Sequence, residues 1–308
     1  MKTLLLTGPT GIGKSHLVNN LKSRLKCIVI NTDALQIYSS LKILTARPDD
    51  YSEKYYLYGH VPDDRRYSVG HWLDDVKKVL KEVKKNQVID VVIFVGGSGL
   101  YFKSLINGLA NIPPIDVDTK FRAGQLFQLY GLNYFLKALE KEDKTGFEKI
   151  DKNNSHRVLR AWEVLTSTGK PMSYWHGLKS KPVLSSPFKT YKVVLTMNKT
   201  RLDELNSYRF KNMLANGAIE ECREAIKKGL STESQSFNAI GVSEIYQYLN
   251  GTMFFDDMER KAIIRTRQYS KRQMTWFRNN FKDWNFFDLE VLNYSQIEKI
   301  IITNINKK

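Results

Sequence analysis

The chain contains only two cysteines among its 308 residues, Cys27 and Cys222. Two cysteines cannot build a disulfide framework, and neither stands at the spacing of a thiolate zinc site. Long apolar runs are also missing, because none approaches the ~20 residues that a membrane helix needs. Met1 and Lys2 lead at once into an apolar run and a glycine loop, which leaves no room for a signal peptide. We therefore expect a cytoplasmic protein without a membrane partner.

Acidic residues are scarce relative to basic ones. The chain has 48 Lys and Arg against 32 Asp and Glu, which gives a formal net charge of +16. A lysine-rich background produces such an excess without functional meaning, whereas a polyanionic partner requires one. The segment 260–278 holds seven cations and no acid, beside Trp276 and Phe277. This pattern alone leaves open both a solvated basic helix and a helix that binds nucleic acid.

A glycine-rich segment near the N-terminus carries the clearest motif. Residues 8–15 fit the phosphate-loop pattern G-x-x-x-x-G-K-S/T at every fixed position, between a predicted strand and a predicted helix. Backbone N–H groups of such a loop wrap phosphate oxygens, Lys14 can neutralise phosphate charge, and Ser15 can ligate Mg²⁺. The motif predicts phosphate binding but does not specify a nucleotide. The predicted phosphate-binding residues are Gly8, Pro9, Thr10, Gly11, Ile12, Gly13, Lys14 and Ser15.

Asp33 is the candidate acid of the same site. No acid ends the inner apolar run 91–95, where a typical phosphate-loop NTPase has the acid that holds Mg²⁺ and water. Asp33 comes just after the predicted strand 27–31, at the strand ends where open α/β sheets bind ligands. A carboxylate there suits a general base that deprotonates an acceptor beside a phosphorylated donor. A helix N-cap is the alternative role.

Short β-branched runs alternate with helical patterns along most of the chain. Strands are predicted at 3–7, 27–31, 91–95, 191–197 and 284–289. Helices are predicted at 15–26, 71–85, 99–109, 201–228 and 256–280, with only helical patterns from 116 to 178. Uninterrupted apolar strands between helices are typical of a parallel sheet covered on both faces. We predict an α/β fold with a P-loop NTPase-like parallel sheet, residues 1–113 and 190–308, and an all-helical insertion domain, residues 114–189.

Several segments match or resemble short patterns that follow one another in a fixed order. They are 8–15 (G-P-T-x-x-G-K-S/T), 33–38 (D-S-M-Q-V-Y), 45–48 (T-A-K-P), 95–101 (V-G-G-T-G-L-Y), 157–164 (R-x-x-R-A-L-E-V), 168–171 (T-G-x-P), 209–217 (R-x-x-x-M-x-x-x-G), 238–241 (Q-A-I-G) and 272–278 (R-Q-x-T-W-F-R). The chain thereby resembles the tRNA dimethylallyltransferases, or isopentenyl-tRNA transferases, over nearly its whole length. Ala34, Leu35, Ser98 and Asn238 depart from the family's usual residues. The zinc finger of many eukaryotic members is missing, so a bacterial-type enzyme is expected.

The resemblance implies a reaction. The family transfers a dimethylallyl group from dimethylallyl diphosphate to N6 of adenosine 37, next to the anticodon of tRNAs, and releases diphosphate. The phosphate loop would bind the diphosphate, with Lys14 and Arg209 as cations and Mg²⁺ on Ser15 as the implied cofactor. Asp33 would take the proton of the exocyclic amine. The implied partners are dimethylallyl diphosphate and the tRNA anticodon stem-loop, and a monomer is expected.

The resemblance also implies which residues contact tRNA. Gln36 carries an amide that can pair with both a donor and an acceptor on an adenine edge, and Ser98 could donate to the tRNA backbone. In the insertion, residues 156–160 are carried over from the family pattern, and Arg122 is added from its position alone. The complete set is Asp33, Ala34, Leu35, Gln36, Thr45, Arg47, Ser98, Arg122, His156, Arg157, Val158, Leu159, Arg160, Arg272, Gln273, Trp276 and Arg278.

Three alternatives share parts of this pattern. A small-molecule kinase would use the loop for ATP and Asp33 as base, and would turn over ATP without tRNA. An adenylate isopentenyltransferase would perform the same chemistry on a free nucleotide, and comparison of AMP with tRNA as acceptors separates the two. A non-enzymatic RNA-binding protein would have no use for an intact loop beside Asp33, and prenyl transfer would exclude it.

Overall fold

The computed structural model describes residues 1–48, 54–85, 88–178, 180–185 and 189–307. The chain divides into two compact units, which we call the core unit, Met1–Ile106 with Val183–Lys308, and the insertion unit, Asn107–Pro182. The insertion predicted at 114–189 starts and ends further along the chain than this unit, and its residues 179 and 186–188 lie outside the described ones. No helix in the described part of the chain combines the length and apolar character needed to span a bilayer.

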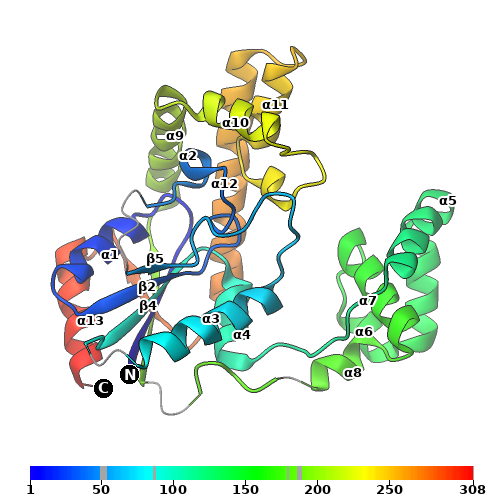
Figure 1. The fold of residues 1–308 in the computed structure, drawn as a ribbon, viewed down its shortest axis with the longest axis horizontal. Helices are drawn as coiled ribbons and strands as arrows, with labels where there is room; N and C mark the ends of the chain where they lie inside the picture. The colour runs from blue at the N-terminus through cyan, green and yellow to red at the C-terminus, as the bar shows by residue number, and fades with distance from the viewer. Residues whose placement is uncertain (49–53, 86–87, 179, 186–188, 308) are drawn as a thin grey trace. The chain divides into compact units, whose positions relative to one another are not determined.

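A parallel sheet forms the centre of the core unit (Figure 1). Its strand order is β3-β2-β4-β1-β5-β6, and each pair of neighbouring strands is parallel. The strands are β1 (Lys2–Thr7), β2 (Cys27–Asn31), β3 (Tyr55–Tyr56), β4 (Val91–Gly96), β5 (Lys189–Thr196) and β6 (Asn285–Asp288). Strands β2 and β4 are buried along their whole length, as expected for a parallel sheet covered on both faces. The predicted α/β fold class is confirmed.

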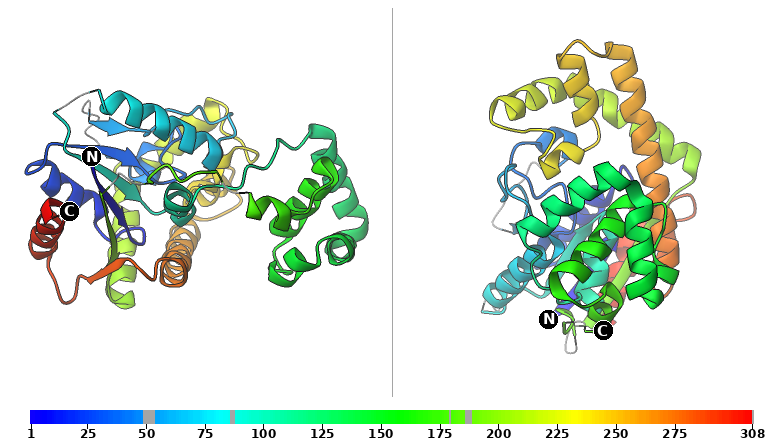
Figure 2. Two further views of the ribbon diagram at one scale, coloured as in Figure 1. Left: turned by 90° about the horizontal axis from the view of Figure 1, so that it is seen from below. Right: turned by 90° about the vertical axis from the view of Figure 1, so that its right-hand side faces the viewer.

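Helices cover both faces of this sheet. The described helices of the core unit are α1 (Lys14–Lys22), α2 (Lys42–Thr45), α3 (Val69–Val83), α4 (Gly99–Asn107), α9 (Lys199–Ala215), α10 (Ala218–Lys227), η1 (Gln235–Asn238), α11 (Val242–Leu249), α12 (Phe255–Asn280) and α13 (Tyr294–Lys307). Helices α1 and α13 lie on one face and α3 on the other (Figure 2). Leu17 of α1 and Ile301 of α13 join Leu4 and Leu6 of β1 in one cluster. Trp72 of α3 packs against the opposite face.

A second cluster holds the helices that line the site. Leu44 of α2, Phe210 of α9, Cys222 of α10, Ile245 of α11 and Met258 of α12 are buried together. The long helix α12 begins in this cluster and continues to α4, where Trp276 lies on Gly99. It therefore carries side chains from the helical cluster to the ends of the strands.

Two predicted elements differ from the observed ones. The helix predicted at 201–228 is two helices, α9 and α10, because Gly217 has a φ of 94° and ends the first. The helix predicted at 15–26 ends at Lys22. Strand β3 and the helices α2, α11 and α13 were not predicted. The first two are too short for a periodicity to identify them.

The insertion unit is a helical bundle. Its helices are α5 (Val117–Glu142), α6 (Lys144–Lys149), α7 (Ser155–Thr168) and α8 (Met172–Gly177). Phe135 of α5 packs edge-to-face on Trp162 of α7, with ring centroids 5.2 Å apart. Helix α5 bends at Gly131, whose φ of 65° is non-helical. The side chain of Asp143 accepts from the N–H of Gly146 at 2.9 Å and so caps α6.

Candidate active site

The phosphate loop connects β1 to α1, and its backbone conformation requires glycine at two points. Gly11 and Gly13 have φ values of 79° and 83°, in the left-handed region that L side chains avoid. The hydroxyl of Tyr294 donates to the carbonyl of Ile12 at 2.7 Å, and a Cβ on Gly13 would collide with that hydroxyl. Helix α13 therefore fixes the loop, and α1 begins at Lys14 with its first N–H groups directed at it.

Lys14 is folded back over the loop that it belongs to. Its Nζ donates to the carbonyls of Gly8 at 2.8 Å and Pro9 at 2.9 Å. Desolvation lowers the pKa of Lys14 to about 8, an effect that Asp33 opposes and Arg209 reinforces. The amine is thus mostly charged at neutral pH, and carbonyl oxygens occupy positions that phosphate oxygens can take.

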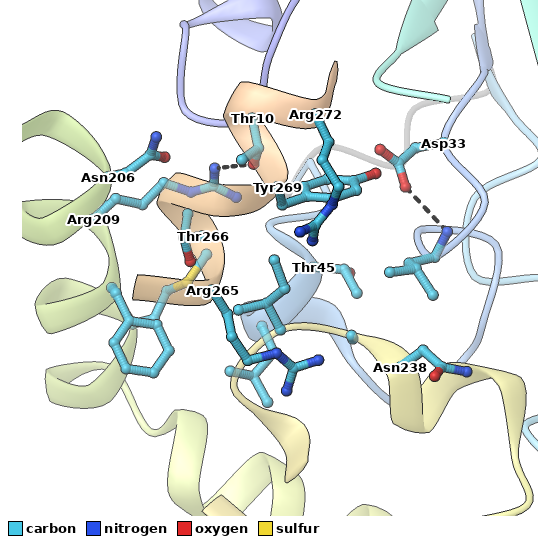
Figure 3. A pocket seen from close by; sticks show the side chains of 16 residues that line it. Thr10, Asp33, Thr45, Asn206, Arg209, Asn238, Arg265, Thr266, Tyr269 and Arg272 are labelled. Atoms are coloured by element: carbon cyan, nitrogen blue, oxygen red, sulfur yellow. Dashed lines mark hydrogen bonds between the residues drawn. The ribbon is translucent and has the colours of Figure 1, made fainter. Parts of the chain in front are cut away.

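Arg209 brings a second cation to the loop from α9. Its Nη1 donates to Oγ1 of Thr10 at 2.9 Å (Figure 3). Desolvation lowers the pKa of Arg209, and the charge of Asp33 partly offsets this. Two partly desolvated cations on one loop create the electrostatic environment of an anion site.

Asp33 is hydrogen-bonded to neighbouring residues, and one of its two carboxylate oxygens remains without a hydrogen bond in the described part of the chain. The side chain of Asn31 accepts from the N–H of Asp33 at 2.9 Å and donates to its carbonyl at 3.0 Å. Oδ1 of Asp33 accepts from the N–H of Leu35 at 3.0 Å, and within the described residues no hydrogen bond is made to Oδ2. The N-cap alternative does not apply, because the next helix, α2, begins only at Lys42. Oδ2 is therefore available for a substrate proton.

Glycines after β4 let three segments approach one another closely. A Cβ on Gly96 would lie 2.1 Å from the backbone of Thr32, and one on Gly99 would lie 2.2 Å from the Trp276 ring. Between them, Oγ of Ser98 accepts from the N–H of Ala34 at 2.9 Å. The hydroxyl proton of Ser98 remains available to donate, and the segment 95–101 thus supports the Asp33 turn.

Thr10, Asp33 and Arg209 line one cavity of about 160 Å³. In Figure 3, Asp33 faces Tyr269 and Arg272 of α12, while Thr10 and Arg209 lie beside them. The lining residues are Thr10, Asp33, Leu35, Leu44, Thr45, Asn206, Arg209, Phe210, Met213, Asn238, Ala239, Ile240, Arg265, Thr266, Tyr269 and Arg272. Cations, a carboxylate and apolar side chains in one cavity suit a ligand with an anionic part and a hydrocarbon part.

Tyr269 and Asn206 are among the lining residues that were not predicted as site residues from the sequence. Burial and the charge of Asp33 raise the pKa of Tyr269, whose ring lies toward Asp33 (Figure 3). Tyr269 stands three residues before Arg272, so helical spacing on the basic segment could have placed both on one face. Asn206 stands three residues before Arg209 on α9 and could have been found in the same way.

Gln36 and its surroundings form a rigid turn beside the cavity. Its Nε2 donates to the carbonyls of Thr45 at 2.9 Å and Ala46 at 3.2 Å, and Thr45 itself lines the cavity. The predicted pairing of the whole Gln36 amide with a base does not fit this geometry, because both Nε2 hydrogens are directed to backbone carbonyls. Arg47 donates from Nη2 to the carbonyl of Ser39 at 2.6 Å.

The basic segment forms α12, but its cations are not all uncompensated. Three of the seven arginines and lysines have acidic partners from the first turn of α12 or from other helices. These pairs are Arg260–Asp257 at 2.6 Å, Arg265–Glu244 at 2.6 Å and Arg267–Asp203 at 2.9 Å. Four cations have no ion pair within the described ranges, namely Lys261, Lys271, Arg272 and Arg278, and all four are exposed. The absence of acids within residues 260–278 therefore does not leave all seven cations unpaired, because the acidic partners lie outside that segment.

Gln273 lies in a position that differs from the expected tRNA contact, whereas a tRNA contact by the half-buried Trp276 stays a prediction. Gln273 is 6% exposed; its Oε1 accepts from the N–H of Thr10 at 2.9 Å and its Nε2 donates to the carbonyl of Gly97 at 3.0 Å. The predicted direct contact of Gln273 with RNA is therefore wrong, because its buried amide joins the phosphate loop to the segment that contains Gly97. Trp276 is half-buried and packs edge-to-face on Phe281, with ring centroids 5.1 Å apart.

The tRNA-contact residues predicted in the insertion unit are partly exposed and partly buried, depending on the helix face on which they lie. Arg122, His156, Arg157 and Arg160 are exposed. Val158 is fully buried in the core of the unit, and Leu159 packs against that core. The expectation that the Val158 side chain contacts tRNA is wrong, because the helical period of α7 turns it inward. A tRNA contact by the half-buried Leu159 stays a prediction.

Ser15 is the residue that fits the implied Mg²⁺. Its side chain is exposed in the first turn of α1, next to the loop. No cluster of three His, Cys, Asp or Glu side chains suited to a metal occurs in the part of the chain that the structure describes. A hydroxyl with the oxygens of a bound diphosphate and water is a donor set that Mg²⁺ accepts, because this ion commonly takes only one or two protein ligands.

The parallel sheet and the loop between β1 and α1 define a P-loop protein of the α/β class. A family model described as IPP transferase matches residues 36–280. The chain belongs to this family, as the sequence predicted, and the predicted enzyme class, a transferase, is confirmed.

Individual relatives agree with this assignment. The tRNA dimethylallyltransferase of Sinorhizobium medicae is 38% identical over 293 residues, which are 92% of this chain and 94% of the relative. That of Allorhizobium ampelinum is 36% identical over 289 residues, with the same coverage of 92% and 94%. The crystal structure of the full-length tRNA isopentenylpyrophosphate transferase of Bacillus halodurans matches with a TM-score of 0.70 and 27% identity, over 99% of this chain and 97% of that one.

Proposed function

We propose that the protein transfers a dimethylallyl group from dimethylallyl diphosphate to N6 of adenosine 37 in tRNA and releases diphosphate. The observation that carries the proposal is one cavity in which the phosphate-loop residue Thr10 and Arg209 lie opposite Asp33. Family membership and relatives named tRNA dimethylallyltransferase support tRNA prenylation. Because tRNA is the acceptor, we expect the reaction in the cytoplasm.

The loop side of the cavity acts on the donor. The diphosphate displaces the carbonyls that hold Lys14, and its oxygens accept from the loop amides, Lys14 and Arg209. As the bond from C1 to the bridging oxygen breaks, both electrons leave with diphosphate, and these fixed cations stabilise the growing charge. Mg²⁺ on Ser15, when bound, neutralises further charge on the leaving group.

Asp33 acts on the acceptor. The adenine N6 attacks C1, a new N6–C1 bond forms, and Oδ2 of Asp33 takes the proton that N6 loses. Asn31 holds the backbone of Asp33, and the N–H of Leu35 binds Oδ1, which leaves Oδ2 for the proton. Ala34, Ser98, Gln36 and Thr45 shape the turn around it. The base must leave the loop stack to reach this cavity, which costs a few kcal/mol.

The charged surface is proposed to bind the tRNA backbone and to offset that cost. On α12 the exposed cations Lys261, Lys271, Arg272 and Arg278 are suitable for phosphate contacts. In the insertion unit the exposed residues Arg122, His156, Arg157 and Arg160 are the candidates. We propose that one chain suffices, because every residue that lines the cavity belongs to the core unit.

The test uses purified protein with labelled dimethylallyl diphosphate, Mg²⁺ and either unmodified tRNA or AMP. We expect prenylated adenosine in tRNA and no transfer to AMP. Transfer to AMP alone would favour the adenylate isopentenyltransferase, and ATP turnover without prenyl transfer would favour a kinase. Loss of transfer in Asp33→Asn, with unchanged tRNA binding, assigns the base.

A further inference from the structure

Asn206 of α9 carries a buried polar atom that the proposed reaction leaves unused. Its side chain is 1% exposed, and Nδ2 donates to Oγ of Ser270 at 3.3 Å. Its Oδ1 is buried and has no hydrogen-bond partner among the described residues. Buried amide groups are normally satisfied at both ends, so an orphaned oxygen needs an explanation.

The orphaned oxygen lies against the phosphate loop. A Cβ on Gly11 would be only 2.1 Å from Oδ1 of Asn206, so the amide directly faces the loop backbone at that residue. Asn206 also lines the cavity with Thr10 and Arg209, and Figure 3 shows its amide on the Arg209 side of that cavity. The absence of a side chain at Gly11 leaves the space that the amide occupies.

We propose that Asn206 is a further ligand of the donor diphosphate, and that its amide turns by half a rotation when the anion binds. An amide oxygen beside an anion is repulsive, whereas the turned amide presents Nδ2–H to a phosphate oxygen. Oδ1 then accepts from the hydroxyl of Ser270, which can donate as well as accept. Both ends of the amide are satisfied in the bound state. The inference rests on the proposed function, because it assumes that the loop binds a diphosphate.

A neutral donor suits this position. Lys14 and Arg209 already bring two cations to the loop, and the charge of Arg209 lowers the pKa of Lys14. A third cation would lower it further and weaken the charge that holds the leaving group. The Asn206 amide adds a hydrogen bond without this penalty, since it carries no charge at any pH.

The test measures binding of inorganic pyrophosphate with Mg²⁺ to the full chain by calorimetry. We expect Asn206→Ala to weaken binding about tenfold, in line with one hydrogen bond to a charged group. Asn206→Asp should weaken binding more than Asn206→Ala does, because a carboxylate in the same place repels the anion. Neither change should alter the affinity for tRNA. A structural defect in α9 would lower the tRNA affinity as well as the pyrophosphate affinity.

Asn212 provides the matched control, because it lies exposed on the same helix. Asn212→Ala and Asn212→Asp repeat both changes and should leave the pyrophosphate affinity within twofold of the unchanged chain. Equal affinity of the Asn206 variants and the unchanged chain overturns the inference. If the unchanged chain itself fails to bind pyrophosphate, the proposed function fails instead. Should Asn206→Asp not fold, Asn206→Ala decides, because alanine is the best helix former.

Discussion

Gln273 of α12 accepts a hydrogen bond from the backbone N–H of Thr10, with 2.9 Å between Oε1 and N. Its other end donates to the carbonyl of Gly97 at 3.0 Å. One buried amide thus joins the helix with the exposed cations, the phosphate loop and the segment beside Asp33. Its position couples the donor half of the site to the acceptor half.

Gln273→Leu removes both hydrogen bonds and replaces the amide with an apolar side chain of similar size. We expect the KM for dimethylallyl diphosphate to rise about tenfold. A buried hydrogen bond contributes on the order of 1 kcal/mol, and the variant leaves the Thr10 N–H and the Gly97 carbonyl unpaired. Affinity for tRNA should stay unchanged in filter-binding or fluorescence titrations. A selective loss of tRNA affinity, with normal donor kinetics, would instead restore the direct RNA contact predicted from the sequence.

Asp33→Asn keeps the size and one acceptor oxygen but removes the base. We expect kcat to fall by about 10²–10⁴, the usual contribution of a positioned general base. The dissociation constant for tRNA should change less than twofold, because the turn held by Asn31 and Ser98 stays in place. Near-normal turnover by this variant, measured with labelled donor, would show that another group takes the proton.

The pH dependence of donor binding should follow Lys14. Its pKa in the free protein is lowered to about 8 by desolvation, and a bound anion favours the protonated amine. Affinity for dimethylallyl diphosphate should therefore be constant below pH 8 and fall about tenfold per pH unit above it, until the pKa of the bound state is reached. In Lys14→Arg the affinity is lower but should stay flat to pH 10, because arginine keeps its charge. A decline at the same pH in both proteins would rule out Lys14 as its source.

Some cations of α12 form ion pairs within the described part of the protein and others do not, and we expect only the unpaired ones to contact tRNA phosphates. Arg278→Ala should weaken tRNA binding and reduce the slope of log K against log salt concentration by about 0.7–0.9, the loss of one phosphate contact. Arg267→Ala is the matched control on the same helix, because Arg267 is paired with Asp203 at 2.9 Å. Its slope should remain unchanged. Equal slopes for the two variants would show that the pairing does not decide which cation contacts tRNA.

Gly99→Ala tests the close approach of α12 to α4. The added methyl group would lie 2.2 Å from the Trp276 ring, so the ring or the helices must shift. We expect a loss of about 1–3 kcal/mol in the free energy of unfolding, typical of overpacking. Gly124→Ala, where the new methyl group meets nothing within 4 Å, should leave stability unchanged or slightly raised. Denaturant titrations of both variants measure the difference.

The parts of the fold that follow from local pattern were predictable. Strands β1, β2, β4 and β5 are marked by apolar runs, and the phosphate loop is marked by glycines at fixed positions. Asp33 could be singled out because a residue just after a parallel strand lies at the ligand-binding edge. Helix α7 shows the limit of motif transfer, because Val158 falls within the family pattern but its helical position turns it into the core.

The parts that depend on long-range packing were not predictable from the sequence. Glu244 and Asp203 neutralise arginines of α12 from other helices, and no count within the segment reveals this. Burial of Gln273 follows from the approach of α12 to the glycine segment after β4. Asn206 faces Gly11 only because α9 lies over the phosphate loop. Each of these features is set by the placement of helices that are distant in sequence.

Nucleoside mass spectrometry after reaction of the purified chain with dimethylallyl diphosphate, Mg²⁺ and unmodified tRNA gives the most direct result. Digestion should yield an adenosine with one dimethylallyl group on N6, located at position 37, and the product should be missing when Asp33→Asn replaces the unchanged chain. Unmodified adenosine at position 37, from a protein that binds both dimethylallyl diphosphate and tRNA, would contradict prenyl transfer as its function.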